Sequence, residues 1–166
     1  MVLCPGLRRL SSEHARWLAE LARRAPKSGG RAERLLALWD AKILPRLRAE
    51  EDVLVPELAR RLPEADAAVV FTLADHVALR RLSRALRVAE GAARAVAAEA
   101  LERKLTEHAK FEERTLFPTL QEALGCDRIA ALEIELVRTA REAKRRPLEA
   151  PPAVHEATSG RKERKT

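Results

Sequence analysis

The stretch EHAKFEERTLFPTL, residues 107–120, has an earlier counterpart in PRLRAEEDVLVPEL, residues 45–58. Both contain two adjacent glutamates, then a leucine, a proline and a final leucine at matching positions, which are 62 residues apart. The same offset aligns His14 with His76, although the chain contains only four histidines. The sequence therefore predicts two copies of one helix pair, packed with approximate twofold symmetry.

Helix is favoured along almost the whole chain, because Ala, Leu, Arg and Glu dominate and Gly and Pro are sparse. Pro45 and Pro56 lie inside the second expected helix and predict local kinks rather than breaks. Gly125 is expected to cap the fourth helix, and Asp127 to begin a shorter fifth. The expected helices cover residues 7–25 (or 11–25), 31–62, 92–124 and 127–146, and a third helix begins near Pro63 and ends at about 90. Turns are expected at 26–30, 62–66 and 91.

Four long helices joined by short turns run antiparallel to their neighbours. The predicted fold is therefore all-α, an up-down-up-down four-helix bundle. We expect the bundle at residues 1–125, an additional C-terminal helix at 126–146 and a disordered tail at 147–166, which is rich in Pro and then charged.

The net charge of +7 raises the question of nucleic-acid binding. Residues 141–166 hold eight Lys and Arg against four Glu and so supply +4 of that charge, while aromatic residues for stacking on bases make up only 3%. Nucleic acid is therefore disfavoured as a partner, and the absence of a long apolar run disfavours a membrane. No secretory signal is recognised. Cys4 and Cys126 form no CxxC motif, which predicts reduced cysteines and a cytoplasmic location.

Residues four apart share one helix face, so His108 and Glu112 project together, as do Arg46 and Glu50. His14 and His76 lie on the first and third helices, where they can meet these groups between the helices. Imidazoles and carboxylates suit a divalent iron, manganese or zinc ion, and a carboxylate can bridge two metals. Taken singly, a histidine of this kind is usually a core-edge residue, and EE is usually a solvated face; the matched positions favour a metal site instead. His155, in the tail, is assigned no role.

This pattern resembles the hemerythrin-like, HHE cation-binding family, in which a His on one helix and HxxxE on the next occur twice. The resemblance spans about residues 7–125, and HxxxEExxLFPxL in the fourth helix is its most specific part. It implies a non-haem di-iron centre in a four-helix bundle, with oxygen binding, redox sensing, iron handling or nitric-oxide chemistry as functions. The ligands it implies are His76 and His108 on one iron, His14 on the other, and Glu50 and Glu112 as bridges.

Arg46 departs from the family pattern, because it replaces the second histidine and cannot act as a ligand. We expect Arg46 to pair with Glu50 or Glu112 and the site to hold one metal, with His14 idle or weakly bound. The predicted protein is an iron-binding carrier, store or sensor, rather than an enzyme, with dioxygen or another diatomic molecule as a further partner. The alternative is a metal-free bundle with a structural or protein-interaction role. Neither Glu-x-x-His, typical of ferritin-like oxidases, nor HExxH, typical of zinc proteases, is present.

Overall fold

The computed structural model describes residues 2–22, 30–61 and 67–145. Within these ranges every residue is helical except 2–4, 30, 89 and 90, and no strand occurs, so the predicted all-α class is confirmed. The expected turns at 26–29 and 62–66 and the expected tail at 147–166 lie outside the described residues. The elements are α1 (Pro5–Ala22), α2 (Arg31–Leu38), η1 (Trp39–Ile43), α3 (Leu44–Ala49), η2 (Glu50–Leu54), α4 (Val55–Arg61), α5 (Ala67–Val88), α6 (Gly91–Phe111), η3 (Glu112–Leu116) and α7 (Phe117–Arg145), where η denotes a π-helical turn.

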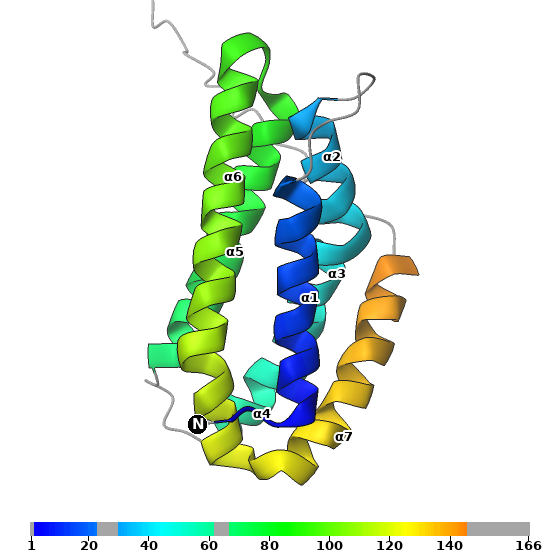
Figure 1. The fold of residues 1–166 in the computed structure, drawn as a ribbon, viewed down its shortest axis with the longest axis vertical. Coiled ribbons are helices and arrows are strands. Elements are labelled where there is room, and N and C mark those ends of the chain that lie inside the picture. The colour runs from blue at the N-terminus through cyan, green and yellow to red at the C-terminus, as the bar shows by residue number, and fades with distance from the viewer. Residues whose placement is uncertain (1, 23–29, 62–66, 146–166) are drawn as a thin grey trace, which may run out of the picture.

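The long helices lie side by side along the long axis of the molecule (Figure 1). α1 and α6 occupy one side, and α5 packs along α6 over most of its length. The row formed by α2, η1, α3, η2 and α4 runs without interruption from one end of the molecule to the other. This arrangement brings one face of each long helix to a common interior.

Three π-helical turns, η1, η2 and η3, each end two residues before a proline, namely Pro45, Pro56 and Pro118. Proline has no N–H to donate, and its ring clashes with the carbonyl four residues earlier. The helix widens to relieve this clash, and the N–H just before each proline donates to the carbonyl five residues back: Leu44 to Trp39, Val55 to Glu50 and Phe117 to Glu112. The distortions expected at Pro45 and Pro56 are therefore π turns, through which the helix continues.

α7 changes direction at Gly125, which has φ 71° and ψ 166°. This backbone conformation is accessible almost only to glycine. Beyond the kink, the rest of α7 runs back along the molecule beside α1 and α3 (Figure 1). The last part of α7 thus adds a further helical layer over one side of the long helices.

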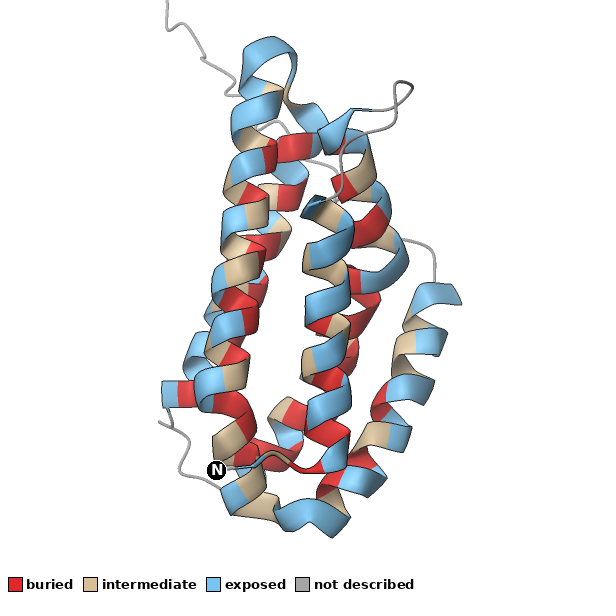
Figure 2. Ribbon diagram, in the orientation of Figure 1, coloured by how far each residue is buried: buried red, intermediate tan, exposed pale blue. Residues whose placement is uncertain are grey.

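Buried residues lie on the facing sides of the helices, with exposed residues outside (Figure 2). They form two hydrophobic clusters, one containing Leu7, Leu58 and Phe117 and the other containing Leu35, Trp39 and Leu101. Between the clusters the buried side chains are polar. Six buried polar residues stand where the members of one cluster give way to those of the other along the helices: His14, Arg46, Glu50, His76, His108 and Glu112.

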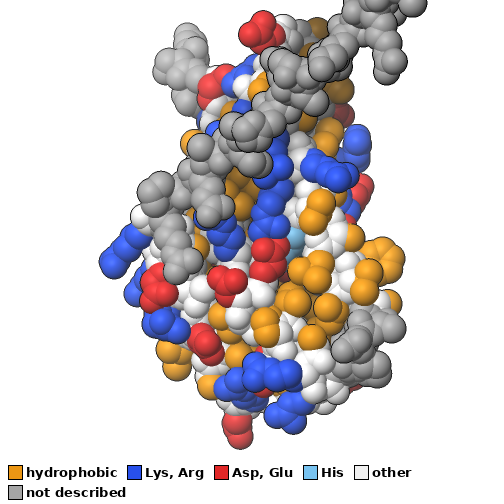
Figure 3. All heavy atoms as spheres, turned by 180° about the vertical axis from the view of Figure 1, so that it is seen from behind, with side chains coloured by type: hydrophobic (Ala, Val, Ile, Leu, Met, Phe, Trp, Pro, Cys, Tyr) orange, Lys and Arg blue, Asp and Glu red, His pale blue; other side chains and the backbone are white. Residues whose placement is uncertain are grey.

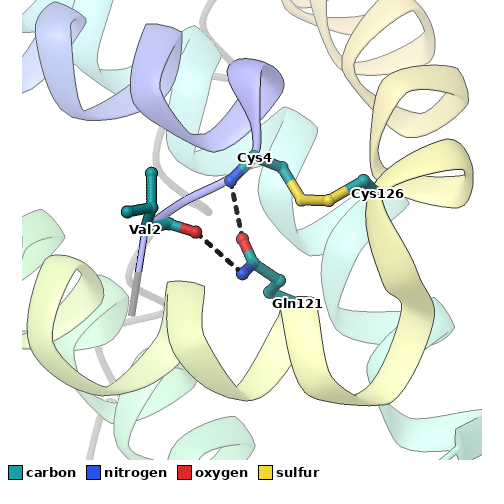
Figure 4. Close-up of a disulfide and its surroundings, with 4 residues drawn as sticks. All are labelled: Val2, Cys4, Gln121 and Cys126. Atoms are coloured by element: carbon teal, nitrogen blue, oxygen red, sulfur yellow. Dashed lines mark hydrogen bonds between the residues drawn. A yellow bond between two sulfur atoms is a disulfide. The ribbon is translucent and has the colours of Figure 1, made fainter.

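Cys4 and Cys126 form a disulfide with a sequence separation of 122 (Figure 4). The expectation that these cysteines stay reduced is wrong, because the kink at Gly125 brings Cys126 beside the segment that precedes α1. Gln121 adds two hydrogen bonds there: it accepts from the Cys4 backbone N–H at 2.6 Å and donates to the Val2 carbonyl at 3.0 Å. The cytoplasmic location was inferred partly from reduced cysteines and loses that support; it stays a prediction.

One face of the molecule carries a group of exposed hydrophobic side chains beside a column of Lys and Arg (Figure 3). α5 contributes several large hydrophobic residues to the surface, among them Val70, Phe71 and Val77, and Phe71 is 59% exposed. None of the described helices combines the length and apolar character needed to cross a membrane.

Candidate metal centre

Four buried side chains converge between the two hydrophobic clusters: Glu50, His76, His108 and Glu112. Each offers one ligand atom, and these atoms all lie within 4.8 Å of one another. Glu50 and Glu112 are the first residues of η2 and η3, so each carboxylate projects from the point where its helix widens. The histidines come from α5 and α6.

The ligand atoms of this group have no hydrogen-bond partner among the described residues. They are His76 Nε2, His108 Nε2, Glu50 Oε2 and both carboxylate oxygens of Glu112. Within the group of four, these atoms lie farther apart than good hydrogen bonds: His76 Nε2 is 3.5 Å from Glu50 Oε2, and His108 Nε2 is 3.4 Å from Glu112 Oε1. Buried polar atoms without partners are rare and costly. Two imidazole nitrogens and two carboxylates fit a divalent cation, which would satisfy all of them.

The other ring nitrogens of the two histidines face acidic side chains. His76 Nδ1 lies 2.8 Å from Glu51 Oε1, and Arg80 holds the same carboxylate with two hydrogen bonds of 2.7 Å. His108 Nδ1 lies 3.6 Å from Asp75 Oδ2. A carboxylate that is hydrogen-bonded to Nδ1, as Glu51 is to His76, orients the ring of a metal-binding histidine and leaves Nε2 for the ion. Asp75 faces His108 from beyond hydrogen-bond distance, and His108 Nδ1 has no hydrogen-bond partner among the described residues.

Glu51 and Asp75 are ionised in these positions. Burial would raise the pKa of Glu51, but the hydrogen bonds from His76 and Arg80 lower it to about 2. Burial also opposes ionisation of Asp75, whose pKa is nevertheless lowered by His108 and by the Lys104 ammonium, with which it forms an ion pair. Neither Glu51 nor Asp75 was predicted from the sequence, although the 62-residue offset aligns Asp75 with Glu13.

Arg46 is only 4% exposed, and its Nε donates a 2.6 Å hydrogen bond to Glu50 Oε1. Of the two partners expected for Arg46, the structure thus provides Glu50. Arg46 Nη1 also lies 3.8 Å from Glu13 Oε2. The contact between Glu13 and Arg46 corresponds, 62 residues later, to the contact between Asp75 and His108. The guanidinium therefore occupies the place that the offset gives to an imidazole.

His14 is buried, and its Nε2 lies 3.2 Å from Glu112 Oε2. It is not part of the four-residue group, and its Nδ1 has no hydrogen-bond partner among the described residues. Its ring stacks against Phe117, with centroids 5.9 Å apart. Burial lowers the pKa of His14 to about 4, which the charge of Glu50 only partly opposes, so the imidazole is neutral at pH 7.

The two glutamates of the group differ in protonation when no ion is bound. Burial would raise the pKa of Glu50, but the charge of Arg46 brings it below its usual value. Burial and then the negative charge of Glu50 raise the pKa of Glu112 well above its usual range. One buried carboxylate is thus neutralised by a proton and the other by Arg46.

A family model described as the Hemerythrin HHE cation binding domain matches residues 6–120. The chain belongs to this family. Membership of the hemerythrin HHE family implies binding of a metal cation, and the buried Glu50, His76, His108 and Glu112 group could hold it. The resemblance inferred from the sequence is therefore confirmed. Comparisons with curated proteins and with solved structures gave no match.

Proposed function

We propose that this hemerythrin HHE protein binds one metal ion, iron, and acts as a carrier or sensor of oxygen, iron or redox state. The proposed ligands are His76 Nε2, His108 Nε2, Glu50 and Glu112. Iron is preferred over zinc and manganese on the family resemblance, whereas the donor set itself suits all three. The observation that carries the proposal is the convergence of unpartnered ligand atoms in a buried group.

Arg46 supports one ion rather than two. It donates a hydrogen bond to Glu50 Oε1 and leaves Oε2 as the Glu50 oxygen without a partner, and its positive charge lies where a second ion would gain a nitrogen ligand. The positive charge of Arg46 repels a second cation at that place. His14 would then be the only imidazole left at that end, so we propose that it is idle or weakly bound.

Loading the site has a consequence for Glu112. Its carboxyl group holds a proton when the ion is absent, and a ligand carboxylate must lose it, so binding should release a proton from Glu112. When bound, iron would supply a coordination position that dioxygen or another diatomic molecule can take. Burial of the whole group limits access of water to that position.

We also infer that the chain contains an internal repeat within an up-down-up-down bundle followed by a fifth helix. Three contacts recur with the 62-residue offset and support this inference. The contact His14–Glu112 corresponds to His76–Glu50. The contact Arg46–Glu50 corresponds to His108–Glu112. The contact Glu13–Arg46 corresponds to Asp75–His108.

The first experiment is elemental analysis of protein purified without oxygen under iron-replete conditions. We expect about one iron per chain, and we expect H108A to lose it. H14A is the matched control: it also removes a buried imidazole, but it should retain the ion. R46H should raise the content towards two, since it restores the missing nitrogen ligand.

Equal metal content in wild type and H108A would show that the ligands lie elsewhere. Two ions in the wild type would show that Arg46 tolerates a dinuclear centre. No metal would favour the alternative, a structural bundle in which the buried pair of Arg46 and Glu50 replaces an ion.

A further inference from the structure

A second site lies outside the metal cluster, in a cavity of about 370 Å³ between α1, the η1–α3 segment and the last part of α7. The cavity exists because α7 turns back at Gly125 and covers this side of the molecule (Figure 1). Its volume is in the range of small-molecule sites, which begins at about 300 Å³. The proposed metal function makes no use of this space.

The lining of the cavity is strongly basic. Among the described residues that line it, Glu13 is the only acidic one, against five basic ones: Arg16, Lys42, Arg46, Arg141 and Lys144. Glu13 lies 3.8 Å from Arg46 and 3.9 Å from Arg16, so its charge is already shared between two guanidinium groups. A cavity with this imbalance attracts anions.

The two basic residues from α7 are free to meet a ligand. Arg141 and Lys144 form no ion pair within the part of the chain that the structure describes, whereas Lys42 is bound to Glu20 at 2.8 Å. Arg46 forms part of the inner wall, and its Nη2 is buried without a hydrogen-bond partner among the described residues. An anion in the cavity would meet the exposed cations of Arg141 and Lys144 and the buried guanidinium of Arg46.

The remaining lining is apolar and includes Trp17, Pro45, Val137 and Ala140. Such a surface contributes little to binding an inorganic ion, but it can cover the carbon body of an organic one. The geometry points to a site for a small organic carboxylate, with its charge near Arg141 and Lys144 and its apolar part against Trp17. This site does not rest on metal binding.

The test is titration of the full-length protein with benzoate, followed by tryptophan fluorescence and by calorimetry. Trp17 lines the cavity, while Trp39 is fully buried elsewhere in the core, so a fluorescence change reports on the site. We expect saturable binding that weakens with added salt, and no comparable binding of benzyl alcohol, which lacks the charge.

R141E and K144E should each weaken benzoate binding by at least about tenfold, because each replaces an attractive charge by a repulsive one. R138E is the matched control: Arg138 lies on the same helix and pairs with Glu142, but it does not line the cavity. It should change the affinity by less than about twofold, as expected for a screened charge. Circular dichroism of each variant checks that the fold is kept.

Four results would overturn the proposal: no saturation by either method below about 10 mM benzoate, equal binding of benzyl alcohol, an equal loss in R138E, or inorganic phosphate competing as well as benzoate does. The last result would identify a simple anion site that ignores the apolar wall.

Discussion

Removing the disulfide between Cys4 and Cys126 should lower the free energy of unfolding by about 5 kcal/mol. The bond joins residues 122 positions apart, so in the unfolded chain it closes a loop that contains almost the whole bundle. The chain-entropy model gives about 5 kcal/mol for a loop of this length. Since domains are stable by only about 5–15 kcal/mol, this is a third or more of the total.

The folded state should survive the change. Gln121 still binds the Val2 carbonyl and the Cys4 backbone N–H, neither of which involves a sulfur atom. Guanidinium denaturation should be followed by circular dichroism on chelator-treated protein in three forms: oxidised wild type, wild type reduced with a dithiol, and the C4S/C126S double variant. The last two should unfold at the same, lower denaturant concentration, and the double variant should not respond to the dithiol.

Two outcomes would refute this reasoning. One is a free energy of unfolding of the reduced wild type that differs from that of the oxidised form by less than about 1 kcal/mol. Loop closure would then contribute little here. The other is detection of two reactive thiols in native protein that has never been reduced.

Three further predictions concern the metal centre and the kink. E51Q and D75N should each weaken metal affinity by about 10–100-fold while leaving all four proposed ligands in place, as measured by competition with a chelator; unchanged affinity would remove their orienting role. In metal-free protein, His14 has a pKa of about 4 when folded and 6.5 otherwise, so its contribution to stability is complete above pH 6.5 and falls as the pH drops towards 4. The loss of stability approaches about 3 kcal/mol. In parallel urea titrations, H14Q should therefore lose less stability than the wild type between pH 7 and 4. The same dependence of the unfolding free energy on pH in both proteins would contradict this. G125A should destabilise the fold by about 1–3 kcal/mol in thermal melts. The φ angle is 71° there, and an added Cβ would meet nothing within 4 Å, so the whole cost is backbone strain. A neutral substitution would show that the kink is not fixed at this residue.

The helices could be predicted because their signals are local. Composition favoured helix along the chain, Gly125 marked the end of the fourth helix, and the widening before Pro45 and Pro56 follows from the missing N–H of proline. The disulfide could not be predicted in this way, since it depends on how far α7 turns at Gly125. Sequence spacing alone says nothing of that direction.

The candidate centre was partly readable for a different reason. His108 with Glu112, and Arg46 with Glu50, are one helical turn apart, so their common direction follows from helix geometry. Glu51 and Asp75 act across helices, and a single carboxylate beside a ligand is usually a solvated residue. The 62-residue offset aligned Asp75 with Glu13, but it gave no such signal for Glu51. Its counterpart, Glu113, accepts a hydrogen bond from Ser11, and His14 Nδ1 has no partner among the described residues.

The π turns have a consequence for how the centre would recognise an ion. Glu50 and Glu112 each stand six residues before a proline, and each supplies the backbone carbonyl that closes the widened turn. The prolines thus fix the point along each helix from which the carboxylate projects, and this point is set before any cation binds. A centre built in this way is preorganised: the ordering of its oxygens occurs during folding, and an ion would be selected by how well it fits that fixed spacing.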